Sequence, residues 1–202
     1  IIEPLSKIGC NFYPKNKTTL PLTVEGTSMP LAQKHFEYIG SAQVKSAILL
    51  AALNTPGITQ IKTDKTSRNH TENLLETIKS DIKIKKFTKG HLISLRGQKN
   101  LFGFNLNIPG DPSSAAPFII LTLLTANSKL TIKNVNCNTT RIGFINILKK
   151  MNANIKIKNL KKISGENIGN IIIKSSSLKP IKCSKDLVPS AIDEFPLLFI
   201  TA

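Results

Sequence analysis

The sequence has no tryptophan, only three cysteines and no apolar run long enough to cross a bilayer. Cys10, Cys137 and Cys183 lie far apart without a CxxC spacing, which argues against both a disulfide framework and a zinc site. The longest apolar stretch, residues 115–126, is shorter than the roughly 20 residues that a membrane helix needs. We therefore expect a cytoplasmic protein without a membrane segment, a metal or structural disulfides.

Acidic side chains and arginines are also scarce. Lysine and arginine number 28 against 12 aspartates and glutamates, which gives a formal net charge of +16, yet only Arg68, Arg96 and Arg141 are arginines. A lysine excess of this kind is typical of a compositional bias, of small anionic ligands or of nucleic-acid binding. The lysines are spread along the chain, and the aromatic residues do not alternate with them as they do in surfaces that stack bases. We therefore expect no nucleic-acid partner.

The chain contains an internal repeat. Residues 68–85 (RNHTENLLETIKSDIKIK) match residues 141–158 (RIGFINILKKMNANIKIK) at a constant offset of 73. In each copy an arginine precedes an amphipathic helix, and isoleucines that alternate with lysines then predict a half-buried strand. The repeat predicts an α/β architecture.

Three apolar helices are predicted to begin at equivalent points of the repeat. The same offset places Ser41 on Ser114, and a further step places Asp193 in the same position. Serine and aspartate are good N-caps because their side-chain oxygens accept hydrogen bonds from orphan backbone N–H groups. The predicted helices cover residues 44–53, 117–126 and 196 onward. They are apolar nearly all round, which is typical of helices in the interior of a fold.

Helix N-termini that meet at one place would favour an anionic ligand, because they present free N–H groups and partial positive charge. Such a repeat can equally well serve only to build a core. Between the copies, residues 107–112 (NIPGDP) combine prolines and glycine in a strong chain breaker. We therefore predict a domain boundary there, with one domain over residues 1–108 and another over residues 109–202.

Several polar residues stand out near the predicted helix starts. Gln43 is a long amide where an apolar residue would serve the core better. Arg68 could hold a phosphate with two parallel hydrogen bonds, although a lone arginine is usually only solvated, and the equivalent Arg141 is interpreted as structural. Asp193 and Glu194 place two carboxylates before an apolar helix; capping explains one, and a partly desolvated acid suits a general base. The histidines show no metal-ligand spacing.

Four blocks of the sequence resemble one enzyme family. Residues 41–72 (SAQVKSAILLAALNTPGITQIKTDKTSRNHTE) resemble the glyphosate-tolerant, class II bacterial form of the 3-phosphoshikimate 1-carboxyvinyltransferases, or EPSP synthases. Residues 110–115 (GDPSSA), 138–143 (NTTRIG) and 192–196 (IDEFP) are similar to later blocks of that family, in its order and at its spacing. The resemblance covers essentially the whole chain.

The resemblance implies a fold and an activity. The implied fold is a two-domain enolpyruvyl transferase, in which repeated βαβαββ-type units surround buried parallel helices as an inside-out α/β barrel. The implied reaction transfers the enolpyruvyl group of phosphoenolpyruvate to the 5-hydroxyl of shikimate 3-phosphate and releases phosphate, in the biosynthesis of chorismate and the aromatic amino acids. A monomer without cofactor or metal is expected to carry it out.

The resemblance also implies roles for individual residues. Asp193 is expected to hold the 5-hydroxyl of shikimate 3-phosphate and to act as the catalytic base. Gln43 is expected to lie near phosphoenolpyruvate as well as near the shikimate substrate. The residues expected to bind shikimate 3-phosphate are Ser41, Ala42, Gln43, Ser67 and Arg68.

Several motifs of the family are not found in this sequence. The family's Lys-Ser, Arg and Arg-Pro-Met motifs, and its lysine, glutamate and arginine clamp for phosphoenolpyruvate, fall outside residues 1–202. The sequence is therefore interpreted as an internal segment, incomplete at both ends and expected to be inactive alone. Asn69 stands where an aspartate is common, and Lys45 and Ser46 match the class II pattern without an assigned catalytic meaning.

Two alternative functions stay open at this point. The first is the sister enolpyruvyl transferase that acts on a uridine-diphosphate amino sugar; the segment SAQVKS at residues 41–46 does not resemble the corresponding helix start of that family. The second is a non-catalytic repeat module that binds an acidic partner or nucleic acid, which rests on charge and repetition alone.

Overall fold

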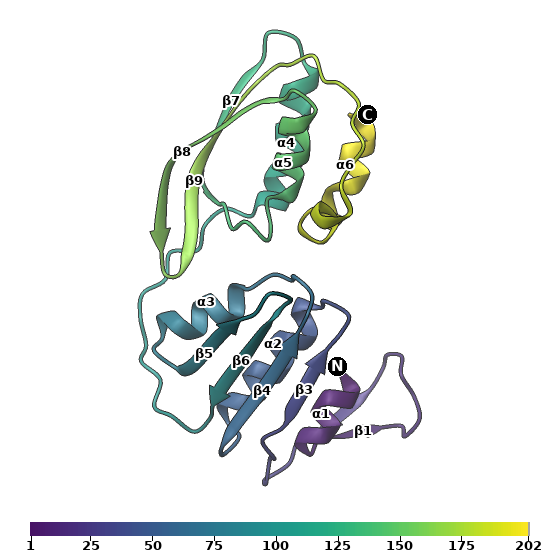
Figure 1. Ribbon diagram of the computed structural model, residues 1–202, viewed down its shortest axis with the longest axis vertical. Coiled ribbons are helices and arrows are strands. Elements are labelled where there is room, and N and C mark those ends of the chain that lie inside the picture. The colour runs from purple at the N-terminus through teal and green to yellow at the C-terminus, as the bar shows by residue number, and fades with distance from the viewer. Residues whose placement is uncertain (202) are drawn as a thin grey trace. The chain divides into compact units, whose positions relative to one another are not determined.

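The computed structural model describes residues 1–201, which divide into two compact units (Figure 1). Unit 1 is Ile1–Phe104, and unit 2 begins at Asn105. The sequence predicts a boundary between residues 108 and 109, and the division in the structure comes between residues 104 and 105. Each unit has its own hydrophobic core.

Unit 1 contains a β-α-β-α-β-β series from its third strand onward, after a short helix and a two-stranded ribbon. Its elements are α1 (Ile2–Ile8), β1 (Asn11–Tyr13), β2 (Thr23–Glu25), β3 (Lys34–Glu37), α2 (Ala42–Leu53), β4 (Ile58–Thr63), α3 (His70–Thr77), β5 (Asp81–Lys86) and β6 (His91–Arg96).

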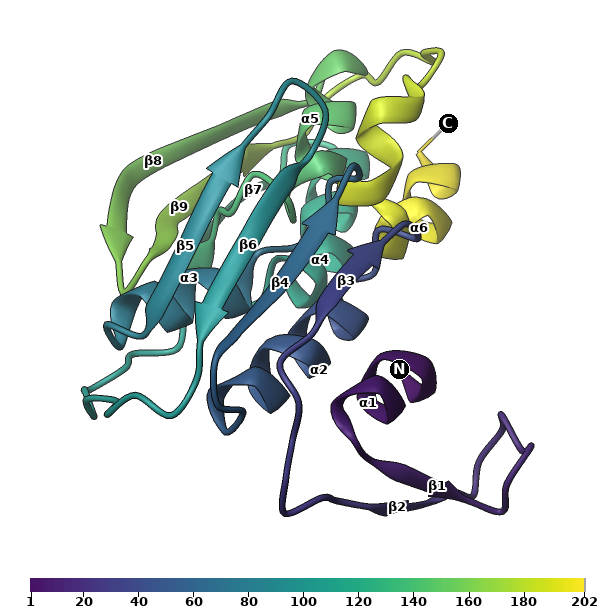
Figure 2. The ribbon, with the colours of Figure 1, turned by 60° about the horizontal axis from the view of Figure 1, so that its bottom comes forward.

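The main sheet of unit 1 has the strand order β3-β4-β6-β5. Strands β3 and β4 are parallel, whereas β6 is antiparallel to both of its neighbours. Helices α2 and α3 lie on the same face of this sheet (Figure 2). Leu49 of α2 and Leu75 of α3 pack there with Ile61 and Ile93 of the central strands, and all four are almost completely buried. This packing fixes where the N-termini of the two helices lie relative to the strands.

Unit 2 repeats this plan with one strand fewer and continues into a third helical segment. Its elements are α4 (Pro112–Leu124), β7 (Lys129–Asn136), α5 (Gly143–Lys150), β8 (Asn154–Ile163), β9 (Glu166–Lys174), the 3-10 helices η1 (Lys185–Ser190) and η2 (Ile192–Glu194), and α6 (Phe195–Ile200).

The sheet of unit 2 has the strand order β7-β9-β8, which corresponds to β4-β6-β5 in unit 1. A single parallel bridge between Gly110 and Val135 takes the place of the β3–β4 pairing. Helices α3 and α5 both have eight residues, and their first residues, His70 and Gly143, are 143 − 70 = 73 apart. The repeat of amphipathic helix and strand that the sequence predicts is therefore confirmed.

Two of the three predicted helix caps are wrong. Ser41 does cap α2, since its hydroxyl oxygen accepts a hydrogen bond from the Val44 N–H at 3.3 Å. Helix α4 begins earlier than predicted, because Asp111 accepts hydrogen bonds from the N–H groups of Ser113 and Ser114 and a proline follows directly in the first turn. Asp193 lies within η2, and α6 begins after it without a side-chain cap.

The interior position predicted for the apolar helices is confirmed on one face only within the described residues. Ile119 and Leu123 of α4 are buried against the sheet of unit 2. On the other side of the helix, Phe118, Leu121 and Leu124 are 60%, 64% and 50% exposed. One sheet covers one face of a helix, so an all-apolar pattern needs a second layer for full burial. Along residues 1–201, no helix has both the length and the hydropathy of a membrane span.

Candidate functional site

Glu37 shapes the turn that leads from β3 to the start of α2. Glu37 ends β3 and is 5% exposed. Its carboxylate accepts hydrogen bonds from the backbone N–H groups of Ile39, Gly40 and Ser41 at 2.9–3.2 Å. Gly40 has a φ of 84°, a left-handed conformation in which a side chain would be strained. The turn thus places Ser41 at the N-terminus of α2.

Ala42 and Gln43 form the first turn of α2. The Gln43 side chain is exposed, and its amide oxygen lies 3.4 Å from the Ser41 hydroxyl, which can donate to it. The first N–H groups of an α-helix have no partner within the helix and carry partial positive charge. A hydroxyl, an amide and free N–H groups therefore come together at one solvent-accessible helix end, a combination suited to an anionic or hydroxylated ligand.

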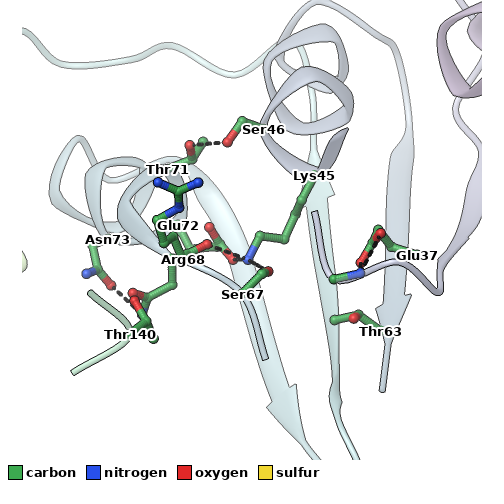
Figure 3. A network of polar contacts seen from close by, with 12 residues as sticks. Glu37, Lys45, Ser46, Thr63, Ser67, Arg68, Thr71, Glu72, Asn73 and Thr140 are labelled. Carbon is green, nitrogen blue, oxygen red and sulfur yellow. Dashed lines mark hydrogen bonds and ion pairs between the residues drawn. The ribbon is translucent and has the colours of Figure 1, made fainter. Parts of the chain in front are cut away.

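Ser67 and Arg68 are joined to the same helix by Lys45. The Lys45 ammonium donates to the Ser67 hydroxyl at 3.0 Å and to the Arg68 carbonyl oxygen at 2.8 Å. It also forms an ion pair with Glu72 of α3, with Nζ and Oε1 2.6 Å apart. Figure 3 shows Lys45 extending from α2 toward these three residues. The five residues predicted to bind shikimate 3-phosphate thus belong to one unit, where Lys45 ties their two segments together.

The sequence reasoning missed the supporting residues of this cluster. Lys45 and Glu72 have side-chain exposures of 1% and 2%. A lysine inside an otherwise apolar helix was the available signal, because a buried ammonium requires acceptors and a counter-charge. Glu37, which lies between Phe36 and Tyr38, carried no such signal, because its role depends on hydrogen bonds from backbone N–H groups that no side-chain pattern reports.

Asp193 lies in unit 2, where Arg141 binds it. The Arg141 guanidinium contacts Asp193 Oδ2 at 2.6 Å and Asp111 Oδ1 at 3.3 Å. Burial alone would lower the pKa of Arg141, but the hydrogen bond to Asp193 and the nearby charges of Asp111 and Glu194 raise the pKa instead. Arg141 therefore connects the start of α4 with η2, in agreement with its interpretation as structural.

Other contacts fix the position of η2 within unit 2. Glu194 is 2% exposed and accepts a hydrogen bond from the Ser113 hydroxyl of α4. Helix α5 starts close to η1, because any side chain at Gly143 would clash with Ser190. Asp193 itself remains partly exposed, with 45% of its side chain accessible. The carboxylate is thus held in one orientation while staying accessible to a ligand.

The described residues contain no group of three or more histidine, cysteine, aspartate or glutamate side chains arranged to hold a metal ion. The three cysteines are free thiols. The polar groups of the two units are hydroxyls, amides, carboxylates and guanidinium groups, which are chemically able to hydrogen-bond a polar anionic molecule, and a carboxylate such as that of Asp193 is able to accept a proton.

Comparison with known proteins identifies one family. Residues 1–202 match the family described as EPSP synthase (3-phosphoshikimate 1-carboxyvinyltransferase). A 3-phosphoshikimate 1-carboxyvinyltransferase of Petrotoga mobilis is 46% identical over 206 residues, covering 100% of this chain and 46% of the relative. The structure of EPSP synthase from Acinetobacter baumannii matches with a TM-score of 0.84 and 37% identity, over 100% of this chain and 45% of that chain.

A more distant structure extends the likeness of fold. The enolpyruvyl transferase NikO from Streptomyces tendae matches with a TM-score of 0.63 at 12% identity, over 89% of this chain and 42% of that chain. The fold is therefore a mixed α/β arrangement shared with part of the enolpyruvyl transferase structures. The chain spans a little less than half the length of the relatives that it matches.

Proposed function

Because the chain belongs to the EPSP synthase family, we propose that the complete protein transfers the enolpyruvyl group of phosphoenolpyruvate to the 5-hydroxyl of shikimate 3-phosphate. The products are 5-enolpyruvylshikimate 3-phosphate and inorganic phosphate. The observation that carries the proposal is the match to this family along residues 1–202, at 46% identity to a relative with that activity in its name.

The arrangement of unit 1 supports the assignment of the shikimate 3-phosphate residues. The N-terminus of α2 offers the Ser41 hydroxyl and the Gln43 amide beside free N–H groups. Arg68 adds a guanidinium, which pairs with phosphate through two parallel hydrogen bonds. We propose that Ser41, Ala42, Gln43, Ser67 and Arg68 bind shikimate 3-phosphate.

The arrangement of unit 2 supports Asp193 as the base. Its carboxylate is partly exposed and is oriented by the Arg141 guanidinium. When substrate is bound, Asp193 would accept the proton of the 5-hydroxyl as that oxygen bonds to C2 of phosphoenolpyruvate, while C3 takes up a proton to complete the tetrahedral adduct. Loss of a proton from the resulting methyl group then expels phosphate and restores the double bond of the enolpyruvyl group.

The finer features of the proposal follow from the resemblance. They are the class II bacterial subtype, the two-domain inside-out α/β barrel with residues 1–108 in the first domain and 109–202 in the second, a monomeric state and a cytoplasmic location. The β-α-β-α-β-β order of unit 1 and the shared strand order of the two sheets support the barrel of repeated units.

The test is an assay of the complete protein with both substrates. Phosphate release and the formation of 5-enolpyruvylshikimate 3-phosphate are followed together, with each substrate omitted in turn as a control. We expect both products in equal amounts, and none when either substrate is left out. Turnover with a uridine-diphosphate amino sugar in place of shikimate 3-phosphate, or no turnover by a folded complete protein, would overturn the proposal.

A further inference from the structure

Lys45 and Glu72 form a buried ion pair for which the packing of unit 1 gives no reason. The ammonium has three N–H donors, and it meets three acceptors: the Ser67 hydroxyl, the Arg68 carbonyl oxygen and Glu72 Oε1. The second carboxylate oxygen of Glu72 is buried without a hydrogen-bond partner among the described residues. Lys45 is therefore the counter-charge of Glu72, and all of its hydrogen-bonding capacity is directed at the segment before α3 and at α3 itself.

Unit 2 shows that the same fold can be built without such a pair. The buried residues Ile48, Leu49 and Ala52 of α2 match Ile119, Ile120 and Leu123 of α4 at an offset of 119 − 48 = 71, which places Lys45 on Ala116. Glu72 is the third residue of α3, and the third residue of α5 is Ile145. Ala116 and Ile145 are both 0% exposed, so they fill the equivalent positions of the second core with apolar side chains.

A second polar contact also joins α2 to α3 in unit 1. The hydroxyl oxygens of Ser46 and Thr71 lie 2.6 Å apart, which joins the fifth residue of α2 to the second residue of α3. The second residue of α5 is Phe144, which is completely buried and has no hydroxyl group. Two adjacent polar links between the helices of unit 1 thus stand where unit 2 has apolar contacts.

Stability alone does not account for this difference. Removing two charges from water costs free energy, and well-packed apolar side chains of similar volume stabilise a core as well as a buried ion pair or better. What the pair in unit 1 adds is geometric: it fixes the backbone at Arg68 and the side chain of Ser67 relative to the first turns of α2. Those are the two segments that the proposed function assigns to shikimate 3-phosphate.

We propose that Lys45 is a positioning residue for the phosphorylated substrate. Through its contacts with Ser67 and Arg68, it holds the segment before α3 at the distance from the N-terminus of α2 that lets both bind one molecule of shikimate 3-phosphate. Lys45 is buried and does not itself contact the substrate. The identity of the ligand, shikimate 3-phosphate, rests on the proposed function. The positioning role of Lys45 rests on its contacts within unit 1.

The test separates positioning from stability by removing both charges at once. Lys45→Met alone leaves the Glu72 carboxylate buried without its counter-charge and is expected to destabilise the complete protein. Lys45→Met combined with Glu72→Leu removes that penalty, so its melting temperature should return close to the wild-type value. Its dissociation constant for shikimate 3-phosphate, measured by calorimetry, should nevertheless rise roughly ten- to a hundredfold because the binding groups are no longer held in register. Wild-type affinity in the folded double variant overturns the proposal.

A matched control uses the exposed ion pair between Lys7 and Glu3. Lys7→Met combined with Glu3→Gln makes a comparable change in side chains at the surface of the same unit, and it should leave shikimate 3-phosphate affinity unchanged. A loss of affinity in this control as large as in the core variant would mean that affinity responds to the loss of any ion pair in unit 1, not to positioning by Lys45, and would also overturn the proposal.

Hydrogen exchange without substrate tests the geometry independently of the proposed function. Amides of residues 66–73 should exchange faster in the Lys45→Met/Glu72→Leu variant than in the wild type; unchanged exchange overturns the positioning role. If that variant fails to fold, Lys45→Met combined with Glu72→Gln, which also removes both charges, provides the same measurement, and unchanged exchange there has the same meaning. A wild-type protein that does not bind shikimate 3-phosphate would refute the proposed function, whatever the exchange result.

Discussion

Arg68 is the residue of unit 1 that we propose binds the phosphorylated substrate through its guanidinium group. Its backbone is fixed by Lys45, and its guanidinium can form a bidentate pair with phosphate. A hydrogen bond to a charged group contributes about 1.5–3 kcal/mol, so Arg68→Ala in the complete protein should weaken shikimate 3-phosphate binding about ten- to a hundredfold. The melting temperature should change little, because the backbone contact with Lys45 survives the substitution.

The control for this prediction is Arg96→Ala, which removes an exposed arginine of β6 that pairs with Asp81. It should leave the dissociation constant for shikimate 3-phosphate unchanged in the same calorimetric titration. If Arg68→Ala unfolds the protein while the folded remainder binds normally, Arg68 is a structural residue.

Asp193 can be tested as a base without the complication of a helix cap. The structure shows that its carboxylate pairs with Arg141 and that α6 has no side-chain cap, so Asp193→Asn removes a partly exposed ion pair, which contributes about 0–1 kcal/mol, but no helix cap of α6. An amide cannot take up the proton of the attacking hydroxyl. Because the loss of a positioned base costs about 10²- to 10⁴-fold in rate, kcat of the complete protein should fall by that amount while shikimate 3-phosphate affinity changes far less.

The same substitution at Asp186, an exposed acid of η1, provides the control and should leave kcat unchanged. Near-normal turnover of Asp193→Asn across the pH range would show that Asp193 is not the base.

At the scale of elements, the start of α4 is held by a carboxylate whose protonation can be followed. Burial alone would raise the pKa of Asp111, but hydrogen bonds from Ser114 and Ser113 and the charge of Arg141 outweigh burial and lower the pKa below its ordinary value of 3.8. A carboxyl group with a lower pKa in the folded state stabilises the fold above its unfolded pKa, and this contribution is lost as the pH falls through the folded pKa.

Asp111→Asn tests this sign, because asparagine caps a helix about as well as aspartate but carries no charge. The wild type should unfold at a higher temperature than the variant near neutral pH, and the difference should shrink once the pH falls below 3.8. Thermal unfolding of both proteins at a series of pH values measures the difference. A gap that is the same in acid and at neutral pH would contradict the predicted pKa shift.

Helices and strands with a regular apolar period could be predicted from the sequence. The residues at which they end, and the buried polar residues that hold them in place, could not. The periodicity of residues 68–85 and 141–158 survives in α3–β5 and α5–β8 because one face of each element packs on a core. The predicted cap of α4 is wrong because the starts of α2 and α3 are 70 − 42 = 28 residues apart, whereas those of α4 and α5 are 143 − 112 = 31 apart, so the offset of 73 does not hold at α4. A lysine inside the apolar helix α2 indicates a buried charge, but the partners of Lys45, like the backbone contacts of Glu37, form only after folding and are not reported by a local pattern.

At the scale of the whole molecule, many of the lysines responsible for the positive charge lie on solvent-exposed faces of strands. Lysines of β5 and β8 lie on exposed positions of their strands, away from the helices that form the cores. Alternation of lysine and isoleucine therefore reflects one covered and one solvated face of a sheet. The strand order of the sheets required the structure, because sequence separation does not specify which strands pair.

The last prediction concerns the 202-residue chain by itself. It spans a little less than half the length of its relatives, and the resemblance places the lysine, glutamate and arginine clamp for phosphoenolpyruvate outside it. Charged groups that stabilise a developing charge contribute a large share of enzymatic rate enhancement, so their absence should abolish turnover even where the shikimate residues and Asp193 are present. The chain, mixed with shikimate 3-phosphate and phosphoenolpyruvate, is expected to release no phosphate.

The complete protein in the same assay is the positive control, and circular dichroism of the chain establishes whether its helices and strands are formed. Shikimate 3-phosphate binding by the folded chain, measured in parallel, would show that unit 1 keeps its ligand site while catalysis requires the remainder of the protein. Phosphate release that depends on both substrates and is catalysed by the 202-residue chain would show that residues 1–202 contain a sufficient active site, and that the clamp assigned to other segments is not needed for the reaction.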